Sequence, residues 1–585
     1  MSIQLMLARE DGRPYLAEEG CDPDEATKAA APATEEAFSN FREDFEQPND
    51  LSKQRWGLIV PEGPEGKRLT ELMAPLIAAR KEEQGEQPFI FTVPPDMTSS
   101  QAADWWGKVY NGKSYNSVAL TETNRPRYLL ILGDPRQISW EAQQYFSANA
   151  YVGRLSFPDD AGYKAYMYKL LAYERAAKIE EKKVRAMFFT VLDGTAATST
   201  GHTGLMKPTI AALEEEYVAK ALEAAGLVQL GKDTPVTPEE FLQANESRDP
   251  TMLFTISHGI GAAANVEDNE RRRIQGAMSF GQGKRITAED VAGRPFLPGG
   301  AWFFFACFSA GTPTRTAYRH WLARLKEAGL AVRQSDIDGV LTSLAKDESF
   351  VAALPQAALA NPDGPLAVMG HVDLAWTFSF QDGLSKSFRS SRFQNVFRGI
   401  VERARIGPSY YDLQRVFNVA NNDLTGMLNE EEEARELNRT LADEKDRPLR
   451  KAGLWMLRQD LTAYVLLGDP AARIAATASP DEVRKVVANV VTEASDAAAG
   501  LSPEDEMGDS PAPTEGDGPL NNVPAAAALG TIDPAKIEAA VFPKIGDEAL
   551  EAIAKHFGVP RAELDAWMTT YQEAGRAAVR NKNSA

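Results

Sequence analysis

The stretches TMLFTISHG (251–259) and AWFFFACFSAG (301–311) decide the fold, because each is an apolar run of strand length that ends in small or polar residues. Their apolar residues do not alternate with polar ones, which is typical of strands buried on both faces. Similar runs recur along the chain, and segments with apolar residues at helical spacing lie between them, as at 68–83, 162–182 and 210–227. This alternation predicts an α/β fold, a mainly parallel sheet with helices on both faces.

The overall composition excludes several classes of protein. Of 585 residues, 43% are hydrophobic and 25% are charged, as in ordinary globular proteins. The net charge of −20 disfavours a nucleic acid or an anionic membrane as partner. Two cysteines, Cys21 and Cys307, and the lack of a recognisable secretory signal favour a reducing compartment, so we expect a cytoplasmic protein. The zinc motifs His-Glu-x-x-His and Cys-x-x-Cys do not occur, so we expect no metal and no cofactor.

Composition also divides the chain. Residues 1–50 are acidic and rich in Ala, which predicts a mobile leader. Residues 500–528 are rich in Pro, Gly, Ser and acidic residues, which predicts a disordered linker. Beyond it, residues 529–585 contain amphipathic helical patterns, which predict a small helical C-terminal unit.

Reactive side chains follow two of the predicted strands. His258 comes directly after TMLFTIS, and Cys307 comes directly after AWFFFA. If the two strands are neighbours in a parallel sheet, the imidazole and the thiol lie at the same edge, where open α/β sheets gather their function. An imidazole beside a thiol favours the thiolate, which attacks a carbonyl carbon and forms an acyl-enzyme. The N–H groups of Gly259 and Cys307 are then candidates for stabilising the oxyanion.

Each of the two residues also has a plain structural interpretation. A Cys in an aromatic strand is most often an inert buried residue, and a His at a strand end is usually a hydrogen-bonded structural residue. The pair is harder to explain in this way, because both residues end apolar strands and the chain holds only five histidines. Placement at opposite edges of the sheet, or a sulfur sealed from any opening, would contradict a catalytic role.

The motifs ISHG (256–259) and FFFAC (303–307) resemble the caspase-like clan of cysteine peptidases, and within it the gingipain-like peptidases and the CHAT domains. Further likeness lies in NAYVGRLSF (149–157), PLAVMGHVDLAW (365–376) and AYVLLGDPAARI (463–474). The resemblance implies an N-terminal α/β subdomain at 51–180 and a caspase-like catalytic domain at 181–480. Caspase specificity is not implied, because the chain has Ser309 where caspases carry a Gly.

The resemblance also implies roles for individual residues. His258 is the general acid and base, and Cys307 is the nucleophile. Asp193 is the carboxylate that orients the imidazole, with an Asp-Gly turn as the plain alternative. Trp376 is a wall of the substrate pocket, with an ordinary core position as the alternative. Asp373 is a candidate, among several acidic residues, for binding a basic substrate side chain.

Together these observations predict a cytoplasmic cysteine endopeptidase that hydrolyses a protein or peptide substrate through a Cys-His dyad and an acyl-enzyme intermediate. One alternative is a catalytically inactive caspase-like scaffold that recruits partners through its C-terminal helices. Another is an acyl transferase or ligase that uses the same dyad. For the peptidase, we expect the leader, the linker or a regulatory protein partner bound by the C-terminal helices to control access to Cys307.

Overall fold

The computed structural model describes residues 5–13 and 47–483, apart from short gaps at 122–123, 233, 264, 328–332, 383–384, 386, 442–445 and 480. The chain divides by its contacts into two units, Met1–Leu501 and Ser502–Ala585, and every described residue belongs to the first. Most of the predicted leader, the predicted linker at 500–528, the predicted C-terminal unit at 529–585 and Cys21 lie outside the described residues.

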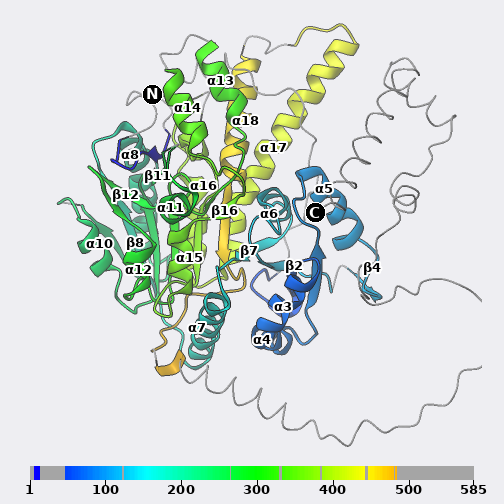
Figure 1. The fold of residues 1–585 in the computed structure, drawn as a ribbon, viewed down its shortest axis with the longest axis vertical. Helices are drawn as coiled ribbons and strands as arrows, with labels where there is room; N and C mark the ends of the chain where they lie inside the picture. The colour runs from blue at the N-terminus through cyan, green and yellow to red at the C-terminus, as the bar shows by residue number, and fades with distance from the viewer. Residues whose placement is uncertain are drawn as a thin grey trace, which may run out of the picture. The chain divides into compact units, whose positions relative to one another are not determined.

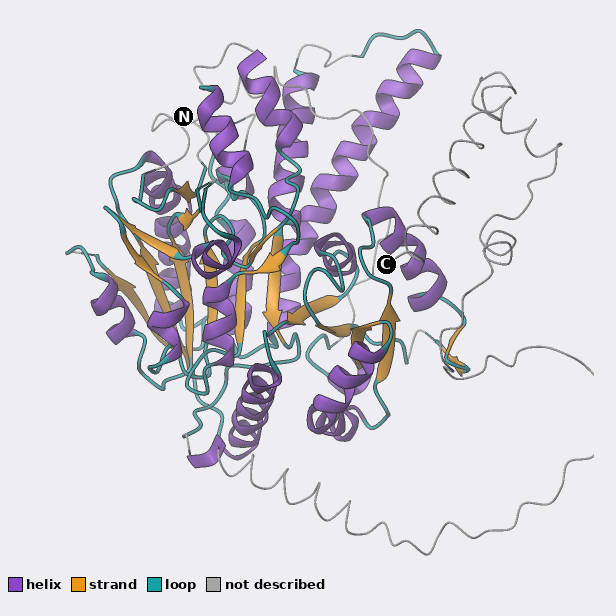
Figure 2. Ribbon diagram, viewed as in Figure 1, coloured by secondary structure: helices purple, strands orange, loops and turns teal. Residues whose placement is uncertain are grey.

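A ten-stranded sheet runs through the described part of the chain (Figures 1 and 2). From one edge to the other, its strands are β3 (Phe89–Val93), β2 (Trp56–Pro61), β6 (Tyr128–Leu132), β7 (Tyr151–Leu155), β18 (Tyr464–Gly468), β17 (Ala367–His371), β14 (Ala301–Phe305), β10 (Thr251–Ile256), β8 (Val184–Thr190) and β9 (Ala224–Leu230). The predicted mainly parallel sheet is therefore confirmed.

The strands form two parallel sets that run in opposite directions. One set holds β3, β2, β6, β7 and β18, and the other holds β17, β14, β10, β8 and β9. They meet at the antiparallel pair β17–β18. The carboxyl ends of β8, β10, β14 and β17 consequently lie at one edge, which we call the site edge. The sheet is continuous across residues 180 and 181, and the division into two domains there stays a prediction.

Helices cover both faces of the sheet, as predicted. Successive residues of a strand point to opposite faces, and in β2 the side chains of Leu58 and Val60 pack in a different hydrophobic cluster from that of Ile59. The first cluster includes residues of α3 (Pro64–Leu72), α4 (Ala74–Gln84) and α7 (Asp160–Ile179). The second includes residues of α5 (Ser99–Trp105), η1 (Trp106–Tyr110) and α6 (Trp140–Ser147).

The remaining elements complete the helical layers and the loops. The larger helices are α9 (Lys207–Val218), α13 (Arg319–Glu327), α14 (Gln334–Thr342), α15 (Ala353–Ala360), α16 (Ser391–Val401), α17 (Ile406–Glu436) and α18 (Arg447–Thr462). The short helices are α2 (Leu51–Gln54), α8 (Ala196–Gly201), η2 (His202–Met206), α10 (Pro238–Ala244), α11 (Asp268–Ile274), α12 (Ala288–Ala292) and η3 (Thr377–Ser379). Small sheets join β1 (Leu7–Ala8), β11 (Gly259–Ile260), β12 (Met278–Gly281) and β13 (Lys284–Ile286), then β15 (Gly311–Thr312) with β16 (Phe350–Val351), and β4 (Ser114–Tyr115) with β5 (Val118–Ala119).

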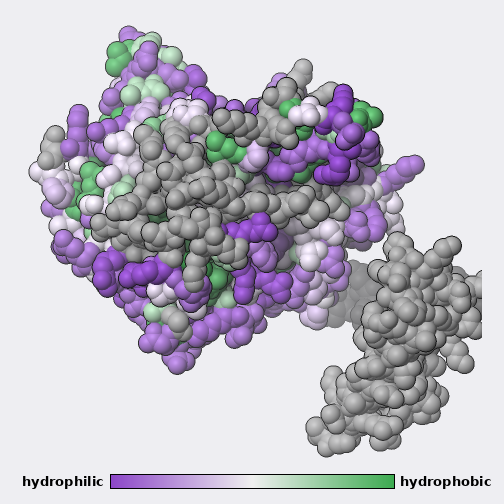
Figure 3. Space-filling model, turned by 90° about the horizontal axis from the view of Figure 1, so that it is seen from above, coloured by the Kyte–Doolittle hydropathy of each residue, from purple (hydrophilic) through white to green (hydrophobic). Residues whose placement is uncertain are grey.

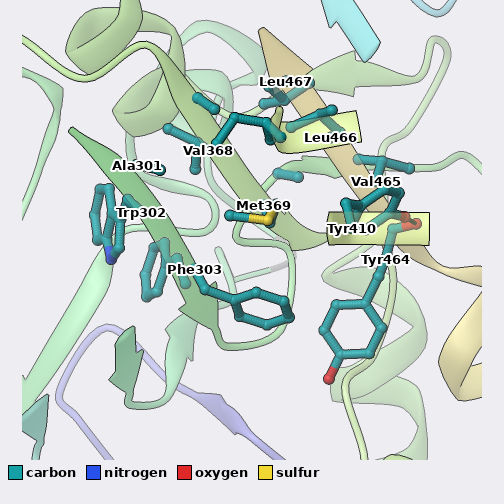
Figure 4. Packing of buried hydrophobic residues seen from close by; sticks show 14 of the residues in the cluster. Ala301, Trp302, Phe303, Val368, Met369, Tyr410, Tyr464, Val465, Leu466 and Leu467 are labelled. Atoms are coloured by element: carbon teal, nitrogen blue, oxygen red, sulfur yellow. Dashed lines mark hydrogen bonds between the residues drawn. The ribbon is translucent and has the colours of Figure 1, made fainter. Parts of the chain in front are cut away.

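The aromatic strand β14 lies in the middle of the core. On one face, the ring of Phe303 lies 5.7 Å from that of Tyr464 in β18 (Figure 4). On the other face, Trp302 stacks on Phe304 at 4.6 Å and donates its indole N–H to Thr255 Oγ1 at 2.9 Å. Each such buried aromatic side chain contributes roughly 1.5–3 kcal/mol through burial. This double-sided packing explains why the strand sequence has no polar residues, and it fixes the position of the residues that follow it.

The face of the described part that is visible in Figure 3 is mainly polar. In Figure 3, hydrophilic side chains predominate and the apolar ones are scattered. Within residues 5–13 and 47–483, every helix is too short or too polar to cross a membrane.

Candidate active site

The site edge brings together the ends of three parallel strands. Ile256, the last residue of β10, lies opposite the last residues of both β8 and β14. The chain therefore leaves all three strands at the same level, and Asp193, His258 and Cys307 follow within three residues of their ends. The predicted dyad residues come from neighbouring strands at one edge, as a shared site requires.

His258 is completely buried and is held on one side by polar groups. Its Nε2 lies 2.9 Å from Thr195 Oγ1 and 3.8 Å from Asp193 Oδ2. Thr195 Oγ1 in turn donates to Asp193 Oδ1 at 2.8 Å. Because a hydroxyl carries a single proton, Thr195 must accept from the imidazole when it donates to the carboxylate. This chain of bonds places the imidazole proton on Nε2 and leaves a lone pair on Nδ1.

The other ring nitrogen of His258 is the free one. Among the described residues, Nδ1 has no hydrogen-bond partner of normal geometry. Burial lowers the pKa of His258 below its ordinary value, and the charge of Asp193 and then the backbone of Met6 oppose that lowering. Burial therefore favours the neutral imidazole, and the Met6 backbone lies close enough to the ring to oppose part of this effect.

Cys307 sits on a tight turn directly after β14. The next residue, Phe308, has a φ of 57°, a left-handed conformation that costs a non-glycine residue about 1–3 kcal/mol. The sulfur is fully buried, accepts a hydrogen bond from the Ala375 N–H at 3.2 Å, and lies 3.6 Å from the Ala375 carbonyl oxygen. Burial raises the pKa of the Cys307 thiol well above its ordinary value, and the Ala375 backbone opposes this. The thiol is thus neutral in this state.

Two backbone N–H groups converge on a single oxygen beside the sulfur. The N–H groups of Gly259 and Cys307 donate to the carbonyl oxygen of Met6 at 3.0 and 3.1 Å. Only glycine fits at 259, because a Cβ there would lie 1.8 Å from the Cys307 carbonyl oxygen. The two donors named from the sequence are therefore aimed at one carbonyl group, which is the geometry of an oxyanion hole.

Trp376 lies in the loop after β17 and is fully buried. Its ring packs edge-on against Trp321 at 5.1 Å, and its backbone N–H donates to Asp460 Oδ1 at 2.9 Å. Leu5 forms an isolated antiparallel bridge with it. Trp376 is thus part of the core and also pairs with Leu5. Its role in binding stays a prediction.

The carboxylate of Asp373 is also buried, and it is already engaged. It accepts hydrogen bonds from Thr316 Oγ1 at 2.8 Å and from the Leu374 N–H at 2.7 Å. Burial raises the pKa of Asp373 to about 6, which these hydrogen bonds oppose. Its backbone carbonyl accepts from the Phe308 N–H at 3.1 Å, so Asp373 fixes the turn that carries Cys307. A role in binding a basic side chain stays a prediction.

Several residues of this site carry no signal that identified them from the sequence. Thr195 and Thr198 both donate to Asp193 Oδ1 and hold the carboxylate beside the imidazole. Ala375 contacts the sulfur only through its backbone, which no side-chain motif reveals. Asp460 is a charged residue of α18 that points inward and accepts from the N–H groups at 376 and 379. A pattern Asp-Gly-Thr-x-x-Thr after a buried strand is the one cue that was available, for the two threonines.

Within the described residues, no three His, Cys, Asp or Glu side chains lie close enough to hold a metal ion. No family model matches the sequence. No curated protein matches it either. Among solved structures, a chain described as "Structure of Protease" matches with a TM-score of 0.35 and 15% sequence identity, over 72% of this chain and 79% of that chain. A likeness this distant carries no argument about activity.

Proposed function

We propose that the protein is a cysteine endopeptidase with Cys307 as nucleophile and His258 as general base and acid. The observation that carries the proposal is the convergence of the Gly259 and Cys307 N–H groups on one carbonyl oxygen, between the strand end that holds the imidazole and the strand end that holds the thiol. A buried core needs neither two donors on one oxygen nor a histidine with an unused nitrogen beside them.

The chemistry follows from the positions of these groups. His258 Nδ1 takes the thiol proton, and the sulfur of Cys307 bonds to the carbonyl carbon of the substrate. The negative charge on the carbonyl oxygen is stabilised by the two N–H groups, each worth about 10²–10³ in rate. The C–N bond then breaks, His258 returns the proton to the departing amine, and a thioester remains on Cys307. Water, deprotonated by His258, attacks the thioester and releases the acid and the thiol.

Asp193 and Thr195 support this cycle without touching the substrate. Thr195 bridges the imidazole and the carboxylate, so the Nε2 proton is held in place and Nδ1 stays available as the base. The nearby carboxylate stabilises the imidazolium that forms during attack. Asp193 and Thr195 are thus positioning residues.

The second candidate function is a catalytically inactive scaffold that recruits partners through residues 529–585. The observation that favours it is the complete burial of the sulfur, which is the arrangement named in the sequence analysis as contrary to a catalytic role, together with the raised pKa of the thiol. A scaffold keeps the fold but has no need of a reactive thiol, so the two functions differ in the chemistry of Cys307. An acyl transferase differs from both by forming aminolysis products.

The experiment that tests the proposal is cleavage of a mixed peptide library by the wild type and by Cys307→Ala in parallel. The proposal predicts hydrolysis products with the wild type and none with the variant. Equal product in both preparations, or none in either at high enzyme concentration, contradicts the proposal, and products joined to an added amine indicate a transferase. Iodoacetamide labelling adds a control, because a catalytic Cys307 loses reactivity when His258 is replaced.

A further inference from the structure

A segment distant in sequence lies across the candidate dyad. Leu5–Ala8, which we call the inserted segment, is at most 4% exposed at every residue. Before Met6, it pairs antiparallel with Trp376. After Met6, it pairs parallel with Gly259 and Ile260, so β1 extends the small sheet of β11, β12 and β13 by one strand.

Met6 stands at the centre of this arrangement. Its carbonyl oxygen accepts both N–H groups of the candidate oxyanion hole, and its own N–H donates to the Ala375 carbonyl oxygen at 3.0 Å. Two residues further on, the Ala8 carbonyl oxygen accepts from the Gly261 N–H at 2.8 Å. These contacts use only the backbone of the inserted segment, so any extended peptide can make them.

The side chains of the segment fit an apolar environment. Met6 and Leu7 are fully buried, and they belong to the same hydrophobic cluster as Trp376. Asp373, the acidic residue named from the sequence for binding a basic side chain, has its oxygens engaged by Thr316 and Leu374. An unbranched thioether side chain adapts easily to an irregular apolar pocket, whereas a buried, unpaired cation is strongly disfavoured.

We propose that the inserted segment is held as a substrate is held, with the Met6–Leu7 bond presented to Cys307, and that the enzyme takes extended peptides with an unbranched apolar residue at the place of Met6. This inference rests on the proposed peptidase function. While the inserted segment is in place it slows the access of other peptides to Cys307, so the wild type hydrolyses peptides only through the fraction of molecules from which the segment is released, and full release opens the site.

The first test measures access to Cys307 by iodoacetamide, with Cys21→Ser in every protein so that one thiol remains. Met6→Asp places a carboxylate in the apolar pocket and should release the segment, raising the alkylation rate by at least about tenfold. Val218→Asp is the matched control, because it places the same new carboxylate on an apolar side chain that is 80% exposed. It should label as slowly as the wild type. Equal rates in all three proteins overturn the proposal.

A peptide added in trans separates release of the segment from damage to the fold. The synthetic peptide IQLMLARE, residues 3–10, should return Met6→Asp to slow labelling, and a scrambled peptide should not. Fast labelling that neither peptide slows overturns the proposal, because a disrupted site cannot bind the segment.

Fluorogenic peptides then test the subsite in the Met6→Asp protein. A peptide ending in Leu-Met before the reporter should be cleaved at least about tenfold faster than those ending in Leu-Lys or Leu-Asp. Preference for Lys or Asp overturns the inference but leaves the peptidase function standing. A third outcome is that Met6→Asp labels fast, that the peptide IQLMLARE slows the labelling, and that no peptide of any kind is cleaved. This outcome would support binding of the inserted segment at the site and would contradict the peptidase function.

Discussion

Two buried polar residues of the β7 set, Arg154 and Asp469, are bonded differently from two at the site edge, His258 and Asp193. In the set that contains β7, the guanidinium of Arg154 donates to Gln143 Oε1, to the Gly133 carbonyl and to the Ile138 carbonyl at 2.6–2.8 Å. Nearby, the carboxylate of Asp469 accepts from the Trp56 indole, the Ala471 N–H and Arg80. At the site edge, by contrast, His258 Nδ1 and Asp193 Oδ2 have no hydrogen-bond partner among the described residues.

This comparison distinguishes buried polar groups that stabilise the fold from those that are candidates for catalysis. A buried polar atom without a partner costs about 1–3 kcal/mol. Such atoms also occur away from the site edge, as at Trp140 Nε1 and Ser147 Oγ, so a missing partner alone does not indicate a function. Arg154 and Asp469 belong to motifs that contribute to the resemblance but are less diagnostic than those of His258 and Cys307, and their hydrogen bonds hold the sheet together. The position of His258 and Asp193 beside the strand end that carries Cys307, together with their open bonding positions, therefore marks them as candidates for catalysis.

The largest expected effect is a loss of hydrolysis without a loss of stability. Cys307→Ala should lower peptide hydrolysis by more than about 10⁴-fold, because the nucleophile is lost. Its free energy of unfolding should change little, since only the sulfur is removed. Hydrolysis rates and urea denaturation of the same preparation check both expectations. Hydrolysis by the variant near the wild-type rate would show that Cys307 is not the nucleophile.

The converse substitution should lower the stability of the fold without changing the rate of hydrolysis. Arg80→Met leaves the buried carboxylate of Asp469 without its cation, which should lower the free energy of unfolding by about 3–5 kcal/mol. The rate per folded molecule should stay near that of the wild type. Urea denaturation measures the loss, with exposed Arg13→Met as the control. A stability loss below about 1 kcal/mol would count against the structural role given to this set.

A smaller effect is expected for the bridge between carboxylate and imidazole. Thr195→Val removes the hydroxyl that orients His258 and should lower kcat/KM by about 10- to 100-fold, with a shift of the pH profile. Thr203→Val is the control, because Thr203 is exposed and donates only within its own helical segment. A loss of activity with an unshifted pH profile would indicate a merely structural role for Thr195.

The smallest effect is the dependence of stability on pH. His258 has a lowered pKa in the folded chain. Below about pH 6.5 the unfolded chain therefore binds a proton that the folded chain does not bind. The free energy of unfolding should decrease by up to about 1.4 kcal/mol for each unit by which the pH falls. Asp373, with its pKa raised to about 6, acts in the opposite direction as pH falls. Comparing the wild type with His258→Gln from pH 7.5 to 5 cancels the part due to Asp373. A pH dependence unchanged by the substitution would show that His258 is not held neutral.

Much of the fold was predictable because it depends on local pattern. Uninterrupted apolar runs such as AWFFF can be buried only in a sheet covered on both faces, and they were recognisable without any partner. The reversal of direction between β17 and β18 was not predictable, because the residue pattern of a strand is the same in both directions. The continuity of one sheet across residues 180 and 181 depends on pairing between distant strands, which local pattern does not contain.

The candidate site was predictable where it follows strand ends. Asp193, His258, Gly259 and Cys307 each come just after a buried strand, and strand ends of one parallel set meet at one edge. The residues that were missed act through tertiary contacts. The apolar residues LMLA at 5–8 lie in an acidic stretch that predicts mobility, and their partners, the edge of β11 and the loop at 375 and 376, are distant in sequence.

Covalent trapping tests the central claim most directly. Met6→Asp and the wild type, each also carrying Cys21→Ser, are incubated with a peptidyl chloromethyl ketone ending in Leu-Met, and the modified residue is located by peptide mass mapping. The account predicts one thioether per chain on Cys307, formed faster in Met6→Asp, and strongly slowed when His258→Ala is added. An unmodified Cys307, or modification at the same rate with and without His258, would contradict it.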